Sequence, residues 1–239
     1  MAYQSVFQRY EIKYLITSEQ KQRLVAEMAP YMALDQYGRT IIRNIYFDTP
    51  DFRLIRNSIE KPPYKEKLRL RSYEQTSPDT PVFVEIKKKY DSIVYKRRIA
   101  LSESGAMNWI CGTQPVPFTD QISREIDYFL SFYPELRPTV FISYAREAYF
   151  CRSGNGFRIT FDDDILCRRH DLSLGHGPAG SPILANDLVL MEIKCSGGIP
   201  LWMTKLLTQE RIFRTSFSKY GTAYQKLIYP NLQGGYQHA

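Results

Sequence analysis

The chain has 239 residues, of which 44% are hydrophobic and 24% are charged, and its formal net charge is +7. These proportions are typical of a soluble globular protein and exclude a disordered or fibrous chain. The sequence contains no apolar run near the roughly 18 residues of a membrane-spanning helix, and its first residues do not resemble a signal peptide. We therefore expect one domain over residues 1–239 in the cytoplasm, with its four cysteines reduced.

The pattern of apolar residues predicts a chain dominated by strands. A strand is expected over 6–16, followed by a helix that begins after Thr17 and places Leu24, Val25, Met28 and Met32 at helical spacing. The remaining elements, in chain order, are a strand over 41–48, a helix over 51–59, strands over 65–74, 82–90 and 93–101, helices over 102–111 and 120–132, strands over 139–150, 156–163 and 187–195, and helices over 200–209 and 218–228. The short breaks between strands favour an antiparallel, curled sheet.

Charges recur at every second residue in seven of these strands. Because alternate residues of a strand share a face, each strand has one apolar and one charged face. The charged faces comprise Arg9, Glu11 and Lys13; Lys65, Lys67, Arg69 and Arg71; Glu85, Lys87 and Lys89; Lys96 and Arg98; Tyr144 and Arg146; Arg158, Thr160 and Asp162; and Glu192 and Lys194.

A half-solvated sheet explains any single strand of this kind, but it explains the whole set less well. Solvated faces usually mix both signs of charge, whereas here Lys and Arg cluster. Arginine suits bidentate recognition of phosphate, so we expect the charged faces to line one cavity that takes a chain of phosphates. The interspersed carboxylates Glu11, Glu85, Asp162 and Glu192 are candidate ligands of Mg²⁺ or Mn²⁺.

Other candidate sites are weaker. No Walker A motif is present, and His170, His176 and His238 are too scattered to suggest a metal triad. In the run Lys87–Lys89, alternation points Lys88 outward, and the chain lacks the exposed aromatic and basic interleaving of a nucleic-acid platform. Nucleic acid is therefore not an expected partner.

Eight short motifs resemble a known family. They are RYEIKY at 9–14, YFDT at 46–49, KLRLR at 67–71, VEIKKK at 84–89, SYAR at 143–146, FRITFD at 157–162, LMEIK at 190–194 and FSKY at 217–220. In this order they resemble a VTC domain, the catalytic part of polyphosphate polymerases within the triphosphate tunnel metalloenzyme (CYTH-like) superfamily.

The resemblance implies an α+β fold, an antiparallel eight-stranded closed tunnel barrel with flanking helices. It also implies metal-dependent transfer of the ATP γ-phosphate onto a growing polyphosphate chain. Together with the charge pattern, it predicts as catalytic residues Lys13, Arg69, Arg71, Lys87, Arg146 and Arg158. The predicted substrate-binding residues are Lys67, Lys96, Arg98, Tyr144, Lys194, Ser218 and Lys219, and the predicted metal ligands are Glu192, as the principal one, with Glu11, Glu85 and Asp162.

One departure from the superfamily bears on the reaction. Hydrolytic tunnel enzymes typically begin with Glu-x-Glu-x-Lys, and Arg9 stands at the first position here. This substitution favours phosphoryl transfer over hydrolysis of triphosphates. A triphosphatase and a non-catalytic polyphosphate-binding module remain alternatives. The expected partners are ATP and inorganic polyphosphate or pyrophosphate, with Mn²⁺ or Mg²⁺ as cofactor, and export of the product would require a separate membrane protein.

Overall fold

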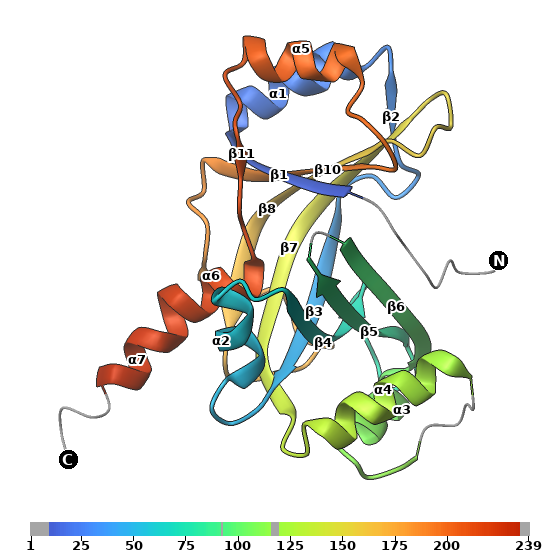
Figure 1. Cartoon of the computed structure of the whole chain (residues 1–239), viewed down its shortest axis with the longest axis vertical. Helices are drawn as coiled ribbons and strands as arrows, with labels where there is room; N and C mark the ends of the chain where they lie inside the picture. Colours follow the sequence, from blue (N-terminus) through green and yellow to red (C-terminus); the bar gives the residue numbers. More distant parts are fainter. Residues whose placement is uncertain (1–9, 92, 116–119, 235–239) are drawn as a thin grey trace.

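Eleven strands form one antiparallel, strongly twisted sheet in the computed structural model, which describes residues 10–91, 93–115 and 120–234 (Figure 1). The strands are β1 (Tyr10–Thr17), β2 (Met32–Leu34), β3 (Thr40–Asp48), β4 (Tyr64–Ser72), β5 (Pro81–Tyr90), β6 (Ile93–Ser102), β7 (Arg137–Cys151), β8 (Arg158–Arg168), β9 (Ser181–Pro182), β10 (Leu188–Cys195) and β11 (Arg214–Thr215). Their order is β11-β1-β10-β8-β7-β3-β4-β5-β6, with β2 paired to β7 and β9 paired to β8.

The helices are α1 (Ser18–Met28), α2 (Arg53–Ile59), α3 (Glu103–Ile110), α4 (Gln121–Phe132), α5 (Leu201–Gln209), α6 (Lys219–Ala223), the π-helical turn η1 (Tyr224–Ile228) and α7 (Tyr229–Gly234). Four of the helices, α1, α3, α4 and α6, begin after a residue whose side chain caps the helix. Thr17 and Gln20 form a reciprocal capping box at α1, and Ser102 and Asp120 accept backbone N–H bonds at the starts of α3 and α4. Among the described residues, no helix is long and apolar enough to cross a membrane.

Each of the eight predicted strands is present, although residues 6–9 of the first lie outside the described residues. The short strands β2, β9 and β11 were not predicted. Met32, which was expected to continue the first helix, belongs to β2 and lies opposite Cys151. The helix ends at Met28, two residues before Pro30, which has no N–H to continue the helical hydrogen bonds.

Helices cover the outer face of the sheet in two places (Figure 1). α3 and α4 pack on β4, β5 and β6, where Trp109 and Phe129 join Leu68 and Val84 in one apolar cluster. α1 and α5 pack on β1, β10 and β8 and form a second cluster. The apolar faces predicted from alternation are therefore the faces that these helices bury.

A third apolar cluster fills one end of the inner face. There, Tyr46 and Tyr144 pack against Tyr220 of α6 and Ile228 of η1. Asp48 anchors this end, since its carboxylate accepts hydrogen bonds from the Leu54 and Ile55 N–H groups and from the Tyr220 hydroxyl.

The expected closed eight-stranded barrel is not formed. β1 pairs with β10 on one edge and with β11 on the other, where Lys13 and Tyr14 lie opposite Thr215 and Arg214, so no β1–β6 pairing appears among the described residues. The sheet is open but curls until side chains from its two halves meet. Lys87 of β5 lies 3.5 Å from Glu11 of β1, although these strands are not neighbours in the sheet.

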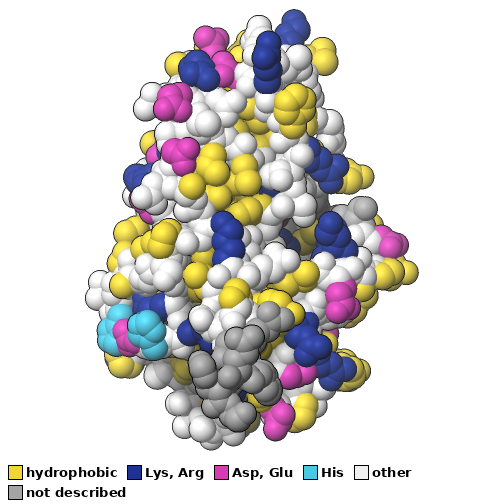
Figure 2. Space-filling model, turned by 90° about the vertical axis from the view of Figure 1, so that its left-hand side faces the viewer, with side chains coloured by type: hydrophobic (Ala, Val, Ile, Leu, Met, Phe, Trp, Pro, Cys, Tyr) yellow, Lys and Arg dark blue, Asp and Glu magenta, His cyan; other side chains and the backbone are white. Residues whose placement is uncertain are grey.

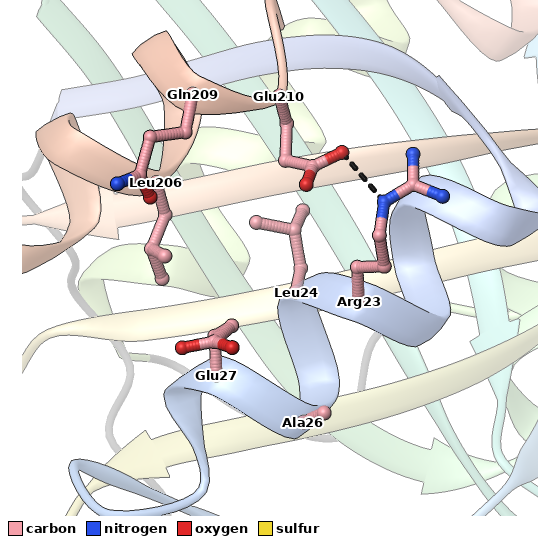
Figure 3. A pocket seen from close by; sticks show the side chains of 7 residues that line it. All are labelled: Arg23, Leu24, Ala26, Glu27, Leu206, Gln209 and Glu210. Atoms are coloured by element: carbon pink, nitrogen blue, oxygen red, sulfur yellow. Dashed lines mark hydrogen bonds and ion pairs between the residues drawn. The ribbon is translucent and has the colours of Figure 1, made fainter.

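A hollow of about 340 Å³ lies on the other side of the sheet, between α1 and α5. Figure 3 shows Arg23 of α1 beside Glu210, which follows α5, and the Arg23 Nε atom donates to the Glu210 carboxylate over 2.8 Å. The hollow contains none of the predicted site residues.

Candidate functional site

The inner face of the sheet gathers the predicted site residues. We call this surface the basic inner face. Its cations are Lys13, Lys67, Arg69, Arg71, Lys87, Lys96, Arg98, Arg146, Arg158, Lys194 and Lys219, and its carboxylates are Glu11, Glu85, Asp162 and Glu192. All but Lys219 of α6 lie on strands, where the two-residue period places them on one side. The contacts below show how the face is built.

Glu85 of β5 is the centre of the first ion cluster. It is only 1% exposed, and its carboxylate lies 2.7 Å from Arg69 Nη2, 3.7 Å from Arg71 Nε and 2.6 Å from Lys96 Nζ. Burial alone would raise the pKa of Glu85, but Arg71, Arg69 and Lys96 hold it well below its usual range. Glu85 is therefore a buried, charged counter-ion of three cations.

Two uncharged residues of β3 complete this cluster. Asn44 Oδ1 accepts a hydrogen bond from Arg71 Nε over 2.9 Å, and the Tyr46 hydroxyl accepts one from Arg69 Nη1 over 3.0 Å. Neither residue was predicted as part of the site. Asn44 and Tyr46 alternate with Ile45 and Phe47, and this alternation could have indicated that they share a face. They were missed because neither Asn44 nor Tyr46 carries a charge.

Asp162 of β8 organises the second ion cluster. Its carboxylate forms a bidentate pair with Arg146 over 2.6 and 2.7 Å, and it accepts a hydrogen bond from Lys219 Nζ over 2.6 Å. Lys219 Nζ also lies 4.4 Å from the centre of the Tyr144 ring. Burial would raise the pKa of Tyr144, but Arg71, Arg146 and Lys219 lower it. Tyr144 also links the clusters, because its hydroxyl accepts from Arg71 Nη2 over 3.2 Å.

Glu192 of β10 joins the second cluster to β1. Its carboxylate lies 3.1 Å from Lys194, 3.6 Å from Lys13 and 3.8 Å from both Arg146 and Lys219. Lys13 also lies 3.3 Å from Glu11. Against the effect of burial, Lys194, Lys219, Lys13 and Arg146 hold the pKa of Glu192 well below its usual range.

The segment 217–220 crosses the basic inner face at its apolar end. Lys13 Nζ donates to the Phe217 carbonyl over 2.9 Å, and Lys67 Nζ donates to Ser218 Oγ over 3.1 Å. Ser218 in turn caps α6 by accepting from the Gly221 N–H. Ser218 and Lys219 are therefore positioned on this face, as predicted for the helix expected over 218–228.

Arg98 and Arg158 are the remaining predicted arginines. Arg98 lies opposite Glu85 in the ladder, with its guanidinium 4.5 Å from the centre of the Phe83 ring. Arg158 lies opposite Lys194 and 4.5 Å from the centre of the Phe150 ring. Both flank the ion clusters.

Lys67 is a partly buried cation, and no carboxylate of the described residues forms an ion pair with it. Burial, followed by the nearby charges of Lys87, Lys13 and Lys65, lowers its pKa to about 7. Burial also lowers the pKa of Lys194 to about 8, although Glu192 opposes the shift. Both shifts disfavour the charged form of the lysine, and a bound anion would oppose them.

The four predicted metal ligands do not form one cluster. Glu85 is held by Arg69, Arg71 and Lys96, whereas Glu11, Glu192 and Asp162 form a row bridged by Lys13 and Lys219. Within the described residues, no three His, Cys, Asp or Glu side chains are arranged to hold a metal. Mg²⁺ commonly binds one or two carboxylates and takes its other ligands from phosphates and water. Glu192 with Glu11 therefore suits such an ion only together with a phosphate substrate.

Several other charged residues of these strands do not lie on the basic inner face. Lys88 points outward and pairs with Glu125 of α4 over 2.6 Å. Asp163 and Asp164 both pair with Arg39. Asp164 has a positive φ at a bulge in β8, so it does not share the inner face with Asp162 as it would in a regular strand. Arg9 lies outside the described residues.

Figure 2 shows one side of the molecule, with its lysines and arginines dispersed among acidic and apolar side chains. The two described histidines lie together there, at its edge, and His176 Nδ1 is 2.5 Å from Asp171. Both histidines are exposed, and His238 lies outside the described residues.

Comparisons with known proteins identify the family. No curated protein matches the chain. A candidate adenylate cyclase from Bacillus halodurans has the same fold, with a TM-score of 0.57 and 15% identity over 90% of this chain and 96% of that chain. A candidate adenylyl cyclase from Hippeastrum, described as having a dominant triphosphatase activity, gives a TM-score of 0.52 and 16% identity over 93% of this chain and 95% of that chain.

The sequence profile of the VTC domain matches residues 8–228, nearly the whole chain. This match covers all eight motifs and all the strands that carry the basic inner face. The chain therefore belongs to the VTC domain family.

Proposed function

We propose that this protein is a metal-dependent polyphosphate polymerase that transfers the γ-phosphoryl group of ATP to the end of a polyphosphate chain on the basic inner face. The observation that carries the proposal is the charge of that face, where eleven lysines and arginines share four carboxylates. Such an array repels itself until an anion neutralises it, and a chain of phosphates supplies many closely spaced negative charges.

The reaction needs few groups from the protein. The bond between the γ-phosphorus and the oxygen bridging to the β-phosphate breaks, a bond forms from the γ-phosphorus to a terminal oxygen of the acceptor chain, and ADP leaves. The attacking oxygen is already anionic near neutral pH, so no general base is required. Arg69, Arg71 and Arg146 offer planar guanidinium groups that orient phosphates and neutralise charge in the transition state.

Mn²⁺ or Mg²⁺ would be held by Glu192, with Glu11 as the second carboxylate. Lys13, which contacts both carboxylates, keeps this pair neutralised in the absence of a metal. When bound, the ion supplies positive charge to the phosphate oxygens. Asp162 remains the counter-ion of Arg146 and Lys219, and Glu85 that of the first cluster.

The test is to incubate the purified protein with ATP and Mn²⁺ or Mg²⁺ and to measure polyphosphate and ADP. We expect both products to form, and Glu192→Gln to abolish them while leaving tripolyphosphate binding largely intact. Glu210→Gln, at the hollow between α1 and α5, is the matched control and should keep full activity. Release of free phosphate without polyphosphate would refute the polymerase.

A triphosphatase is the second candidate. It is favoured by the activity described for the Hippeastrum protein, although that protein shares only 16% identity with this chain. The same assay separates the two functions, because a triphosphatase releases phosphate from tripolyphosphate and builds no polymer. Tight binding with neither product would indicate a non-catalytic module.

A further inference from the structure

Cross-strand lysine pairs extend the basic inner face beyond the two ion clusters. Lys65 lies directly opposite Lys89, and Lys67 directly opposite Lys87, in the ladder between β4 and β5. Lys96 of β6 lies opposite Lys87 on its other side. Like charges that face each other across an antiparallel pair destabilise a sheet, so this end of the sheet carries a cost that the fold does not require.

The same two strands show that the cost is specific to this place. One step further in, the pair is Arg69 opposite Glu85, with opposite charges 2.7 Å apart. On the outer face, Glu66 lies opposite Lys88, again with opposite charges. Only the positions that face inward, near the start of β4 and the β5–β6 turn, repeat lysine against lysine in this ladder.

Lys87 pairs with Glu11 and Lys96 with Glu85, but the neighbouring carboxylates do not compensate Lys65 and Lys89. Every aspartate and glutamate of the chain lies in the described residues, and none forms an ion pair with Lys61, Lys65 or Lys89. Within the described part of the chain, the Ser58 carbonyl accepts a hydrogen bond from Lys65 Nζ over 3.0 Å. Burial lowers the pKa of Lys65, and the charges of Lys89, Lys61 and Lys87 lower it further, so these four lysines are close enough to repel one another.

We propose that Lys65 and Lys89 form an outer subsite that holds the part of a polyphosphate chain lying outside the ion clusters. The proposal rests on the proposed function, since it takes the ligand of the basic inner face to be a chain of phosphates. Lys67 and Lys87 connect the two regions, because Lys67 contacts Ser218 and Lys87 contacts Glu11. One flexible chain can therefore meet successive lysines from the clusters to the β5–β6 turn.

A subsite of this kind makes affinity depend on chain length. The ion clusters alone accommodate a tripolyphosphate, whereas a long chain also reaches the outer lysines. The experiment compares the dissociation constants of inorganic tripolyphosphate and long-chain inorganic polyphosphate for the wild type and for the variant Lys65→Gln/Lys89→Gln. Arg124→Gln/Lys205→Gln, which removes two exposed charges outside the inner face, is the control with the same net charge.

We expect the Lys65→Gln/Lys89→Gln variant to bind the long chain about tenfold more weakly, as for the loss of two exposed charge contacts, and to bind tripolyphosphate within about twofold of the wild type. The control should bind both ligands like the wild type. The variant should also be at least as heat-stable as the wild type without ligand, because it lacks a repulsive pair.

Two results would overturn the outer subsite. One is an unchanged affinity of the variant for the long chain. The other is an equal loss of affinity for both ligands, which would show that the lysines belong to the inner site or act only through the electrostatic field of the whole protein. If the wild type bound neither ligand, the proposed function itself would fail. That outcome is therefore distinct from a failure of the subsite alone.

Discussion

At the level of single side chains, Glu85 provides the clearest test of how the basic inner face is held together. Its carboxylate is buried among Arg69, Arg71 and Lys96. Glu85→Gln keeps the shape but leaves the three cations without their shared counter-ion. Removing one partner of a buried ion cluster costs about 3–5 kcal/mol, and we expect a loss of this size in the free energy of unfolding measured with urea.

Glu125 provides the matched control for this variant. It also pairs with two cations, Lys88 and Arg97, but on the outer face, and its side chain is 20% exposed. Glu125→Gln should cost about 1 kcal/mol or less. Tripolyphosphate should stabilise Glu85→Gln more than Glu125→Gln, since only in the first variant does the added anion also replace a missing counter-ion. Equal losses for the two variants would contradict the role given to Glu85.

The lowered pKa of Lys67 predicts that ligand binding is coupled to proton uptake. Its pKa is lowered to about 7, so much of it is uncharged at pH 8 in the free protein. A bound phosphate raises this pKa, so binding at pH 8 takes up protons, and affinity falls as the pH rises from 7 to 9. Calorimetry of tripolyphosphate binding in two buffers with different ionisation enthalpies measures the uptake.

The conservative variant separates this effect from a simple loss of charge. Lys67→Arg stays protonated throughout the range, so it should retain affinity with a smaller proton uptake. The uptake should not vanish, because the pKa of Lys194 is also lowered, to about 8. A wild-type binding enthalpy that is the same in both buffers would show that Lys67 is already charged before the ligand arrives.

The side chains that could be predicted from the sequence are those whose charge marks them in a regular strand. Lys67, Arg69 and Arg71 follow the two-residue period of β4 without interruption, and Lys88 points outward for the same reason. The position of Asp164 could not be predicted in this way, because a bulge that no local pattern indicates shifts the register of β8. Asn44 was missed because an uncharged residue on a charged face gives no signal.

Among the elements, the segment from α6 to α7 depends on one buried carboxylate. Asp48 accepts hydrogen bonds from two N–H groups at the start of α2 and from the Tyr220 hydroxyl of α6. Asp48→Ala should destabilise the protein by about 3 kcal/mol, because it leaves buried donors without partners. Tyr220→Phe removes a single hydrogen bond and should cost about 1 kcal/mol.

Hydrogen exchange tests where these losses act. In Tyr220→Phe, amide exchange should quicken in α6 and η1 and stay unchanged in α3 and α4, which belong to a different apolar cluster. The segment 217–220 carries Ser218 and Lys219, so the same variant should also weaken tripolyphosphate binding. Uniform quickening across all helices would show that the bond supports overall stability and not the placement of this segment.

The elements also mark the limit of prediction from the sequence. Helix starts were found because Thr17, Ser102 and Asp120 carry capping oxygens next to the first turn. The open edge of the sheet was not predicted. The strand β11 at this edge has only two residues, which is too short to give a periodic signal, and it pairs with β1 from some 200 residues away. Closure of a sheet depends on such distant pairings, so it was the least predictable feature of the fold.

For the molecule as a whole, the excess of positive charge on the basic inner face predicts that a polyanion stabilises the fold. A ligand that binds only the folded state adds about 2.7 kcal/mol when its concentration is 100 times the dissociation constant. For a chain of this length that corresponds to a rise in melting temperature of about 5–10 °C. Thermal unfolding with and without tripolyphosphate measures the shift.

The pI near 9.1 means that a polyanion could also attach to the surface in general, so the shift must be traced to the inner face. Arg71→Gln removes a guanidinium that is only 5% exposed and contacts Asn44 and Tyr144, and it should lose at least half of the stabilisation. Arg124→Gln removes the same charge from the exposed surface of α4 and should keep all of it. If tripolyphosphate stabilised the two variants equally, the polyanion would be acting through net charge, and the basic inner face would not be the binding site.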